Sequence, residues 1–271
     1  VAKCLWYLKN KTKEQAPIEN KGAWLGKMYT ESNELLEKEK GTPNEDANRL
    51  ELTKILNELE KKEGDYYDLW METKVWSLDL MKKAYDWANV KFDHWYFESD
   101  MDSPSITLAK DYFNKGLFIE SEGAIGMDLS EEKLGFCLVI KSDGTGLYAT
   151  KDILLAQQKF SDFDIDKSIY IVDKRQSYHF KQVFKVLEKV GFQHAHQCTH
   201  LEYDFVEMPD GAMSSRKGNI ISLVDLITQM ESTITENYLK KYLNDWPKEE
   251  IKNTARIVAN AAIKYGMIRM D

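Results

Sequence analysis

Apolar residues recur with helical spacing through the first third of the chain. Stripes at residues 24–36, 52–59 and 69–87 advance in steps of three and four, which keeps them on one face of a helix. Between the first two stripes, residues 41–44 read Gly-Thr-Pro-Asn, a combination that interrupts helices. The pattern predicts a helical region over residues 1 to about 95.

The second half of the chain carries short apolar runs instead. Residues 92–128 form short mixed segments, and runs follow at 136–140, 169–172, 199–203 and 220–223. The first two runs are continuous, which is typical of strands buried on both faces. Strands that alternate with helices predict parallel pairing through crossover helices, so the expected fold class is α/β, with half of a doubly wound sheet. The intervening helices are expected at about 152–159 and 178–190.

The tail of the chain, from residue 225 onward, is predicted to be helical. Pro247 is expected to open the last helix, with Glu249 and Glu250 in its first turn, where the helix dipole favours acidic side chains. Its apolar face is expected to hold Ile251, Ala255, Val258, Ala262 and Ile263.

Composition narrows the class of protein. The 271 residues are 43% hydrophobic and 30% charged, as in soluble globular proteins, and no apolar run of about 18 residues predicts a membrane span. The net charge of -8 argues against wholesale electrostatic binding of nucleic acid, although a local basic surface can still meet RNA. Cys4, Cys137 and Cys198 are far apart, which predicts neither a disulfide framework nor a protein metal site and favours a reducing, cytoplasmic location.

A glycine-containing loop at residues 141–152 follows the first buried run. Gly144 and Gly146 permit a tight turn, and Tyr148 and Asp152 share a helix face if the helix begins by Tyr148. A carboxylate beside a phenol suits a planar cation such as guanidinium. The alternative is that Asp152 is an ordinary acidic residue of the first helical turns and Tyr148 an aromatic residue at a strand end.

Two further loops carry candidate chemistry. In residues 173–180, Gln176 can donate and accept hydrogen bonds, and His179 in a first helical turn can reach a ribose or phosphate. A lone histidine of this kind is usually structural. The loop at residues 213–219 combines adjacent cations with small residues, which suits a mobile segment that wraps a polyphosphate, and its alternative is a solvated basic turn.

The three loops together resemble the arginyl-tRNA synthetase family of class I aminoacyl-tRNA synthetases. Residues 213–219 resemble the Lys-Met-Ser-Lys-Ser loop with its Lys-Gly-Asn extension, and residues 141–152 resemble the family block that reads Ser-Asp-Gly, then Tyr, Thr, Arg and Asp. Residues 172–180, 97–99 and 120–124 also match that family's pattern. The resemblance runs over nearly the whole chain.

This resemblance implies roles for individual residues. Tyr148, Asp152 and Gln176 would bind arginine, and His179 would lie by the adenosine. The loop would close over the ATP phosphates and would contain the catalytic group. The implied catalytic residues are Met213, Ser214, Ser215, Arg216 and Lys217, and the implied ATP-binding residues are Gly218 and Asn219. The implied reaction converts arginine and Mg-ATP to arginyl-adenylate and charges tRNA-Arg, in a monomeric enzyme.

The resemblance also implies a domain organisation. Residues 1–16 would end a first Rossmann half, 17–95 would be a helical insertion, 96–230 the second Rossmann half with its parallel sheet, and 231–271 the start of a helical anticodon-binding domain. Because the family's His-Ile-Gly-His signature is absent, the chain is expected to be a fragment that lacks the first half and most of the anticodon-binding domain, and to be inactive by itself.

One departure and two alternatives remain at this point. The family's second loop lysine is replaced by Ser215, so Arg216 or Lys217 must supply that charge. One alternative function is a class I synthetase for another amino acid such as cysteine, although a thiol pocket has no use for the Asp152 carboxylate. The other is a non-catalytic synthetase fragment that binds tRNA or a protein partner.

Overall fold

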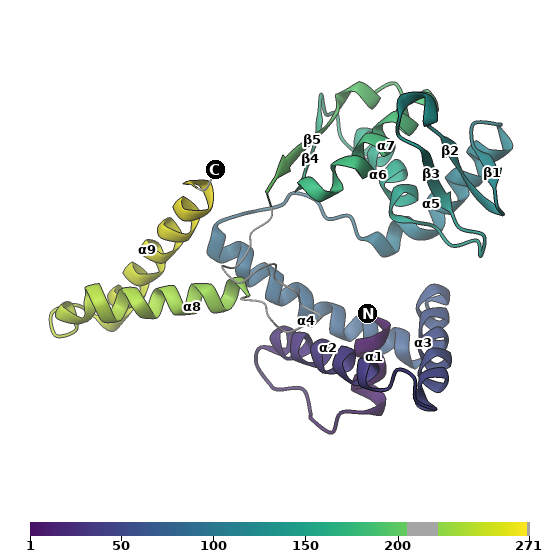
Figure 1. Ribbon diagram of the computed structural model, residues 1–271. Coiled ribbons are helices and arrows are strands. Elements are labelled where there is room, and N and C mark those ends of the chain that lie inside the picture. The colour runs from purple at the N-terminus through teal and green to yellow at the C-terminus, as the bar shows by residue number, and fades with distance from the viewer. Residues whose placement is uncertain (205–221, 270–271) are drawn as a thin grey trace. The chain divides into compact units, whose positions relative to one another are not determined.

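The computed structural model describes residues 1–204 and 222–269. Contacts divide the chain into two compact units: the first combines residues 1–92 with residues 207–271, and the second consists of residues 93–206 (Figure 1). The sequence of the second unit therefore lies between the two parts of the first.

The first unit is helical, as the sequence predicts. Its helices are α1 (Ala2–Asn10), α2 (Lys21–Lys38), α3 (Asn44–Lys61), α4 (Asp65–Ala88), α8 (Leu223–Ile234) and α9 (Lys248–Arg269), with a π-helical turn at Thr235–Leu239 and a 3-10 turn at Lys240–Tyr242. Leu5, Trp6, Ile55 and Tyr66 are buried together and form one core, to which α1, α3 and α4 contribute. Residues of all three apolar stripes pack against this core, among them Leu35, Leu52 and Leu69, whereas Leu56 of the second stripe is exposed.

A second core of the same unit gathers around Trp87, near the end of α4. Trp87 is buried with residues of α8 and α9, and its indole Nε1 donates to Glu231 Oε1 at 3.3 Å. The last backbone carbonyls of α4 are also bonded, because Asn260 Nδ2 donates to Trp87 O and Lys264 Nζ donates to Ala88 O. Helix ends leave such carbonyls without an intrahelical partner, so α9 completes the end of α4.

The tail differs from its prediction in two details. The predicted acidic first turn of α9 is present, but the buried residues are Ile251, Ala255, Ala259 and Ile263, whereas Val258 and Ala262 are exposed. A single stripe at four-residue spacing is buried, which is narrower than the predicted face. The run at 220–223 also does not continue as a strand, since α8 begins at Leu223 with the Ser222 hydroxyl accepting from Asp225 N at 3.1 Å; residues 220 and 221 lie outside the described range.

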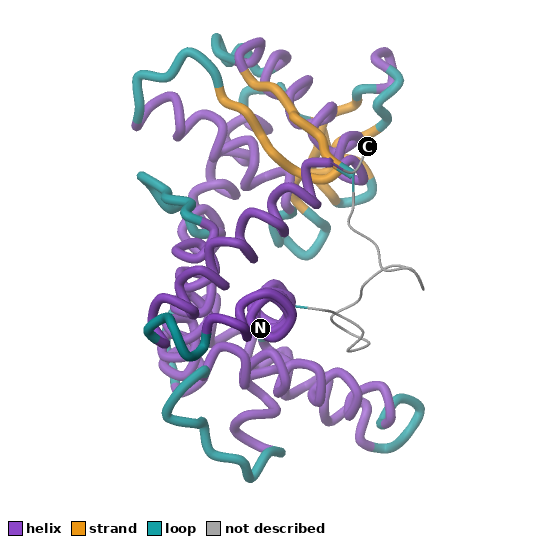
Figure 2. Tube along the Cα trace, turned by 90° about the vertical axis from the view of Figure 1, so that its left-hand side faces the viewer, coloured by secondary structure: helices purple, strands orange, loops and turns teal. Residues whose placement is uncertain are grey.

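The second unit mixes helices and strands, which Figure 2 shows as purple and orange segments. Its elements are α5 (Glu98–Asn114), β1 (Ile119–Ser121), β2 (Ala124–Asp128), β3 (Phe136–Ile140), α6 (Tyr148–Asp162), β4 (Ser168–Asp173), α7 (Ser177–Lys189) and β5 (Cys198–Tyr203), with 3-10 turns at Ser130–Glu132, Lys174–Gln176 and Ala195–Gln197. The α/β class is confirmed. Helix α5 was not predicted, because Pro104 lies inside it and a proline is typical of interrupted helices.

The strands pair in two ways. β4 and β5 are parallel, from Ser168 opposite Cys198 to Asp173 opposite Tyr203, and α7 is the predicted crossover helix between them. β3 instead pairs antiparallel with β2 in a β1-β2-β3 sheet, contrary to the expectation of a parallel partner. The turn at Glu122 and Gly123, both with positive φ, folds β1 and β2 into a hairpin that supplies β3 with its neighbour.

Burial in the second unit corrects a further expectation. β3, α6 and α7 each supply fully buried side chains, for example Val139, Ala156 and Val183 in that order. β4, however, was expected to be buried on both faces, and Ile169 and Ile171 are exposed within the described structure. Only its alternate residues face the core, because α6 and α7 cover one side of the β4–β5 pair.

Candidate functional site

The start of α6 is held against the end of β3 by a short, hydrogen-bonded turn. Gly144 takes a φ of +84°, and Leu147 N then donates to Val139 O at 3.1 Å. The Thr150 hydroxyl, in a side chain that is 1% exposed, accepts from Leu147 N at 3.0 Å and donates to Val139 O. Because Thr150 bonds both the loop and the strand, the first turn of the helix has a fixed position on β3.

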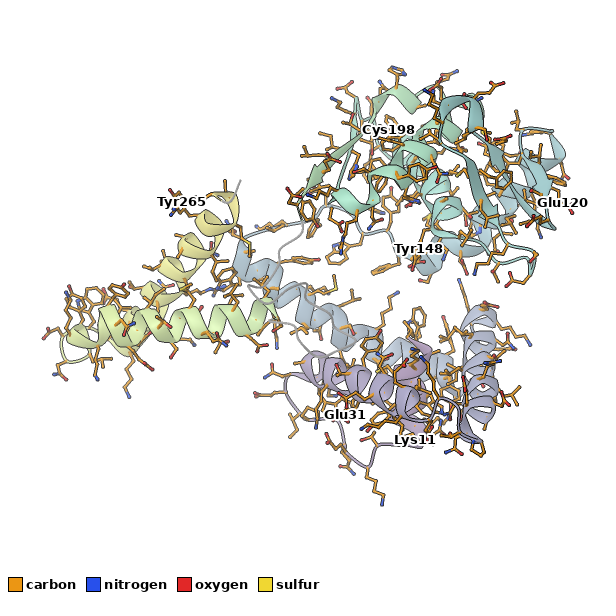
Figure 3. The ribbon with its side chains drawn as sticks, viewed as in Figure 1. Lys11, Glu31, Glu120, Tyr148, Cys198 and Tyr265 are labelled. Atoms are coloured by element: carbon orange, nitrogen blue, oxygen red, sulfur yellow. The ribbon has the colours of Figure 1, made fainter. Side chains whose placement is uncertain are left out.

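Tyr148 and Asp152 lie on the face of α6 that the sequence predicts. The helix begins at Tyr148, so residues four apart stand one turn above each other on one face. Tyr148 is 72% exposed and lies at the surface of its unit (Figure 3). The Asp152 side chain is half-buried. A phenol and a carboxylate are therefore presented together from a rigid element.

Lys151, the residue before Asp152, connects the start of α6 to α5. Lys151 Nζ lies 2.8 Å from Glu98 Oε1 and 2.9 Å from Asp102 Oδ1. Glu98 belongs to the 97–99 motif and Lys151 to the 141–152 motif, so two blocks that are separate in the sequence meet here. Partial burial lowers the pKa of Lys151, but the two carboxylates together outweigh it, so the pKa is raised above its usual value.

Gln176 and His179, the next two predicted site residues, lie at the start of α7, shortly after β4 ends at Asp173. Asp173, at the end of β4, accepts from Arg175 N at 3.0 Å and from Arg175 Nε and Nη2 at 2.8 and 3.0 Å. The arginine side-chain bonds hold the pKa of Asp173 below its usual value. Gln176 follows as an exposed residue at the end of the 3-10 turn, and His179 lies in the first turn of α7.

The structure brings Asp152 and His179 into direct contact. His179 Nε2 lies 2.6 Å from Asp152 Oδ2, and both side chains are about one-quarter exposed, 25% and 26%. This pair therefore joins the first part of α6, which follows β3, to the first turn of α7, which follows β4. The sequence predicted both residues as site residues but not their contact.

Sequence reasoning also missed Lys159, a partly buried lysine of α6. Its Nζ lies 3.6 Å from the centroid of the Tyr170 ring, and burial lowers the pKa of Lys159. Seven residues separate Lys159 from Asp152, which returns it to the same helix face. That spacing was the available signal, and it sets Lys159 about 10 Å further along the helix than Asp152.

The other predicted residues are not placed here. Met213, Ser214, Ser215, Arg216, Lys217, Gly218 and Asn219 all lie outside the described residues. An open cavity of about 830 Å³ in the second unit lies elsewhere, along Lys181, Phe184 and Lys185 of α7, and includes none of the predicted site residues. Within residues 1–204 and 222–269, no three histidine, cysteine, aspartate or glutamate side chains group as metal ligands.

None of the helices in the described part of the chain has the length and apolar character needed to cross a membrane. Cys4, Cys137 and Cys198 are free thiols, and Cys137 and Cys198 are buried.

Comparisons with known proteins agree with the motifs. The family model described as "tRNA synthetases class I (R), catalytic domain" matches residues 4–270. The chain is 58% identical over 271 residues to the arginine–tRNA ligase of Bdellovibrio bacteriovorus, covering 100% of this chain and 47% of that protein. It is 33% identical over 241 residues to the arginine–tRNA ligase of Bacteroides fragilis, covering 86% of this chain and 40% of that protein.

Solved structures show the same fold. The arginyl-tRNA synthetase of Thermus thermophilus matches with a TM-score of 0.77 at 20% identity, over 98% of this chain and 49% of that one. The arginyl-tRNA synthetase of Plasmodium falciparum matches with a TM-score of 0.69 at 18% identity, over 97% of this chain and 42% of that one. The chain thus spans about half the length of the relatives that it matches. On this evidence, the chain belongs to the arginyl family of class I tRNA synthetase catalytic domains.

Proposed function

We propose that the protein to which this chain belongs is an arginine–tRNA ligase. It activates arginine with Mg-ATP to form arginyl-adenylate and pyrophosphate, and it then transfers the arginyl group to the terminal adenosine of tRNA-Arg. Family membership supports the use of ATP, arginine and tRNA as substrates. The activity would place the protein with the translation machinery in the cytoplasm.

The observation that carries this proposal is the shared α6 face of Tyr148 and Asp152. A guanidinium group is a planar cation whose N–H groups form paired bonds to a carboxylate, and its face stacks on aromatic rings. The half-buried Asp152 supplies the first partner and the exposed Tyr148 the second. Gln176, at the start of α7, can donate to or accept from the amino-acid part of the substrate.

The loop of residues 213–219 would act on the phosphates of ATP. Arg216 and Lys217 are the cations available to stabilise the negative charge that builds up on the departing pyrophosphate. Met213, Ser214 and Ser215 precede them, and Gly218 and Asn219 follow. The divalent cation would arrive with ATP.

Arginine-dependent exchange of pyrophosphate into ATP tests the proposal, with the full-length gene product and cognate tRNA. Asp152→Asn keeps the side-chain size and removes the charge. Loss of a charge-assisted pair of about 2–3 kcal/mol predicts a fall in kcat/KM for arginine of about thirty- to one-hundred-fifty-fold. The matched control is Asp111→Asn, an exposed aspartate of α5 that pairs with Lys115.

The alternatives give different outcomes in this assay. A synthetase for another amino acid would exchange pyrophosphate with that amino acid, and Asp152→Asn would leave its kcat/KM unchanged. A non-catalytic binding protein would show no exchange with any amino acid. The same assay on these 271 residues alone tests the expectation that they are inactive by themselves.

A further inference from the structure

His179 is held in one place by its neighbours on α7. The Tyr178 hydroxyl donates to Leu134 O at 2.5 Å, which fixes the residue before it. Phe180, the residue after it, is buried and lies 5.1 Å from the Tyr170 ring and 4.8 Å from the His200 ring, centroid to centroid. Because both neighbours are anchored, the backbone that carries the His179 ring has little freedom to move.

The hydrogen bond from this ring has a defined direction. An ionised carboxylate has no proton to give, so His179 Nε2–H donates to Asp152 Oδ2 across the 2.6 Å that separates them. An aspartate χ2 torsion is broad when nothing restrains it. The bond from α7 therefore sets the plane of a carboxylate that α6 alone would leave free to rotate.

The restraint leaves capacity for a ligand. A carboxylate offers about four acceptor positions on its two oxygens. One position on Oδ2 is taken by His179, so Oδ1 and the second position on Oδ2 remain for the two parallel N–H groups of a guanidinium. Paired hydrogen bonds of this kind need a carboxylate whose plane matches the ligand, which makes orientation as important as charge.

We propose that His179 is a positioning residue for arginine, which acts by holding the Asp152 carboxylate in the plane that receives the guanidinium. The proposal rests on the proposed function, in which Asp152 binds arginine. It differs from the role that the sequence implied for His179, a contact with the adenosine of ATP. The two roles predict changes in the KM of different substrates.

Pyrophosphate exchange by the full-length gene product separates the two roles. His179→Ala should raise the KM for arginine by about ten- to a hundredfold and change the KM for ATP by less than about threefold. His179→Gln should restore most of the arginine affinity, because its amide places an N–H donor near the position of Nε2. His196→Ala, an exposed histidine in the turn after α7, should change neither KM.

A double-mutant cycle shows whether His179 acts through Asp152. In the Asp152→Asn background, His179→Ala should have almost no further effect on the KM for arginine, since the group that it positions has lost its role. Additive effects of the two substitutions would overturn the proposal. A raised KM for ATP with an unchanged KM for arginine would also overturn it and would support the adenosine role.

The remaining outcomes are equally decisive. A His179→Gln variant as impaired as His179→Ala would mean that the ring has another task, and an unaffected His179→Ala variant would mean that Asp152 needs no tether. If the wild-type protein shows no arginine-dependent exchange, the proposed function fails and the role for arginine falls with it. An active wild type with unaffected variants refutes the positioning role alone.

Discussion

Thr150→Val is the most direct test of how the start of α6 is held. Valine has nearly the shape of threonine, so the substitution removes one hydroxyl and creates almost no cavity. The Thr150 hydroxyl is buried and makes two hydrogen bonds, one from Leu147 N at 3.0 Å and one to Val139 O. Both are lost in the variant, and the backbone groups cannot turn to water in their place.

The expected loss of free energy depends on the hydrogen bonds that Leu147 N and Val139 O retain in the variant. Leu147 N still donates to Val139 O at 3.1 Å, so neither backbone group is left wholly unpaired. Two hydrogen bonds with a net contribution of about 0.5–1.5 kcal/mol each, reduced by the surviving bond, predict a loss of about 1–2 kcal/mol in the free energy of opening this region.

Amide hydrogen exchange followed by mass spectrometry measures that loss locally. In peptides that cover β3 and the first half of α6, the slowest amides should exchange about five- to thirtyfold faster in the variant. The control is Thr107→Val in α5, the same substitution at an exposed threonine whose hydroxyl bonds Ser103 O at 3.1 Å. It should change exchange by less than about twofold.

Equal effects of the two substitutions would refute this role of Thr150, because burial of the hydroxyl would then make no difference. Faster exchange of the Thr150→Val variant only at the chain ends of the unit would refute it as well. The same variant should weaken arginine binding, since Tyr148 and Asp152 stand on the turn that Thr150 fixes.

Further predictions concern packing, thiol reactivity and pH. A Cβ on Gly126 would lie 2.4 Å from the Cys137 carbonyl oxygen, so Gly126→Ala should lower the free energy of urea unfolding by about 1–3 kcal/mol. The control is Gly26→Ala in α2, where a Cβ would meet no atom within 4 Å; it should raise that free energy by about 0.5–1 kcal/mol. Burial raises the pKa of the Cys137 thiol to about 11, so iodoacetamide at pH 8 should label Cys137 only after unfolding. Hydrogen bonds from the Thr145 hydroxyl and then from Thr145 N lower the pKa of Asp143. The Asp143 carboxylate therefore stabilises the folded turn above about pH 4, and this contribution is lost as the pH falls through the pKa of the folded state. Thr145→Val should move the NMR titration of the Asp143 carboxyl to higher pH.

Much of the helical architecture could be predicted because helical periodicity is a local property. The three stripes before residue 90 each predict a helix that the structure contains, and the strand–helix–strand order predicts the parallel β4–β5 pair. The direction of β3 could not be predicted in this way. Its run Phe136–Ile140 indicates burial, but burial is the same beside a parallel or an antiparallel neighbour.

In the candidate site, too, features that depend on one helix could be predicted, and contacts between elements could not. The spacing of Tyr148 and Asp152 could be predicted because it depends on one helix, and the structure places the start of that helix at Tyr148. The bond between Asp152 and His179 depends on how α6 and α7 pack, which no local pattern encodes. Thr150 is similar, because its partner Val139 belongs to the preceding strand and its burial becomes visible only in three dimensions.

The bonds that complete the end of α4 have a consequence for synthesis of the chain. Asn260 and Lys264 lie 173 and 176 residues beyond Trp87 and Ala88, the residues whose carbonyls they bond. At about 5–20 residues per second, a ribosome needs roughly 10–35 s to deliver them. Residues 93–206 are made within that interval, so the second unit is complete in sequence before α8 and α9 can cover Trp87.

Of these two units, the helical one is therefore completed after the one that interrupts its sequence. Its final step closes a loop of about 170 residues, for which the entropy cost grows only slowly with length, so the delay rather than the free energy is the burden. A nascent chain halted before residue 251 would lack all four buried residues of α9, so only α8 could cover the apolar end of α4 and part of it would remain open to solvent and to chaperones.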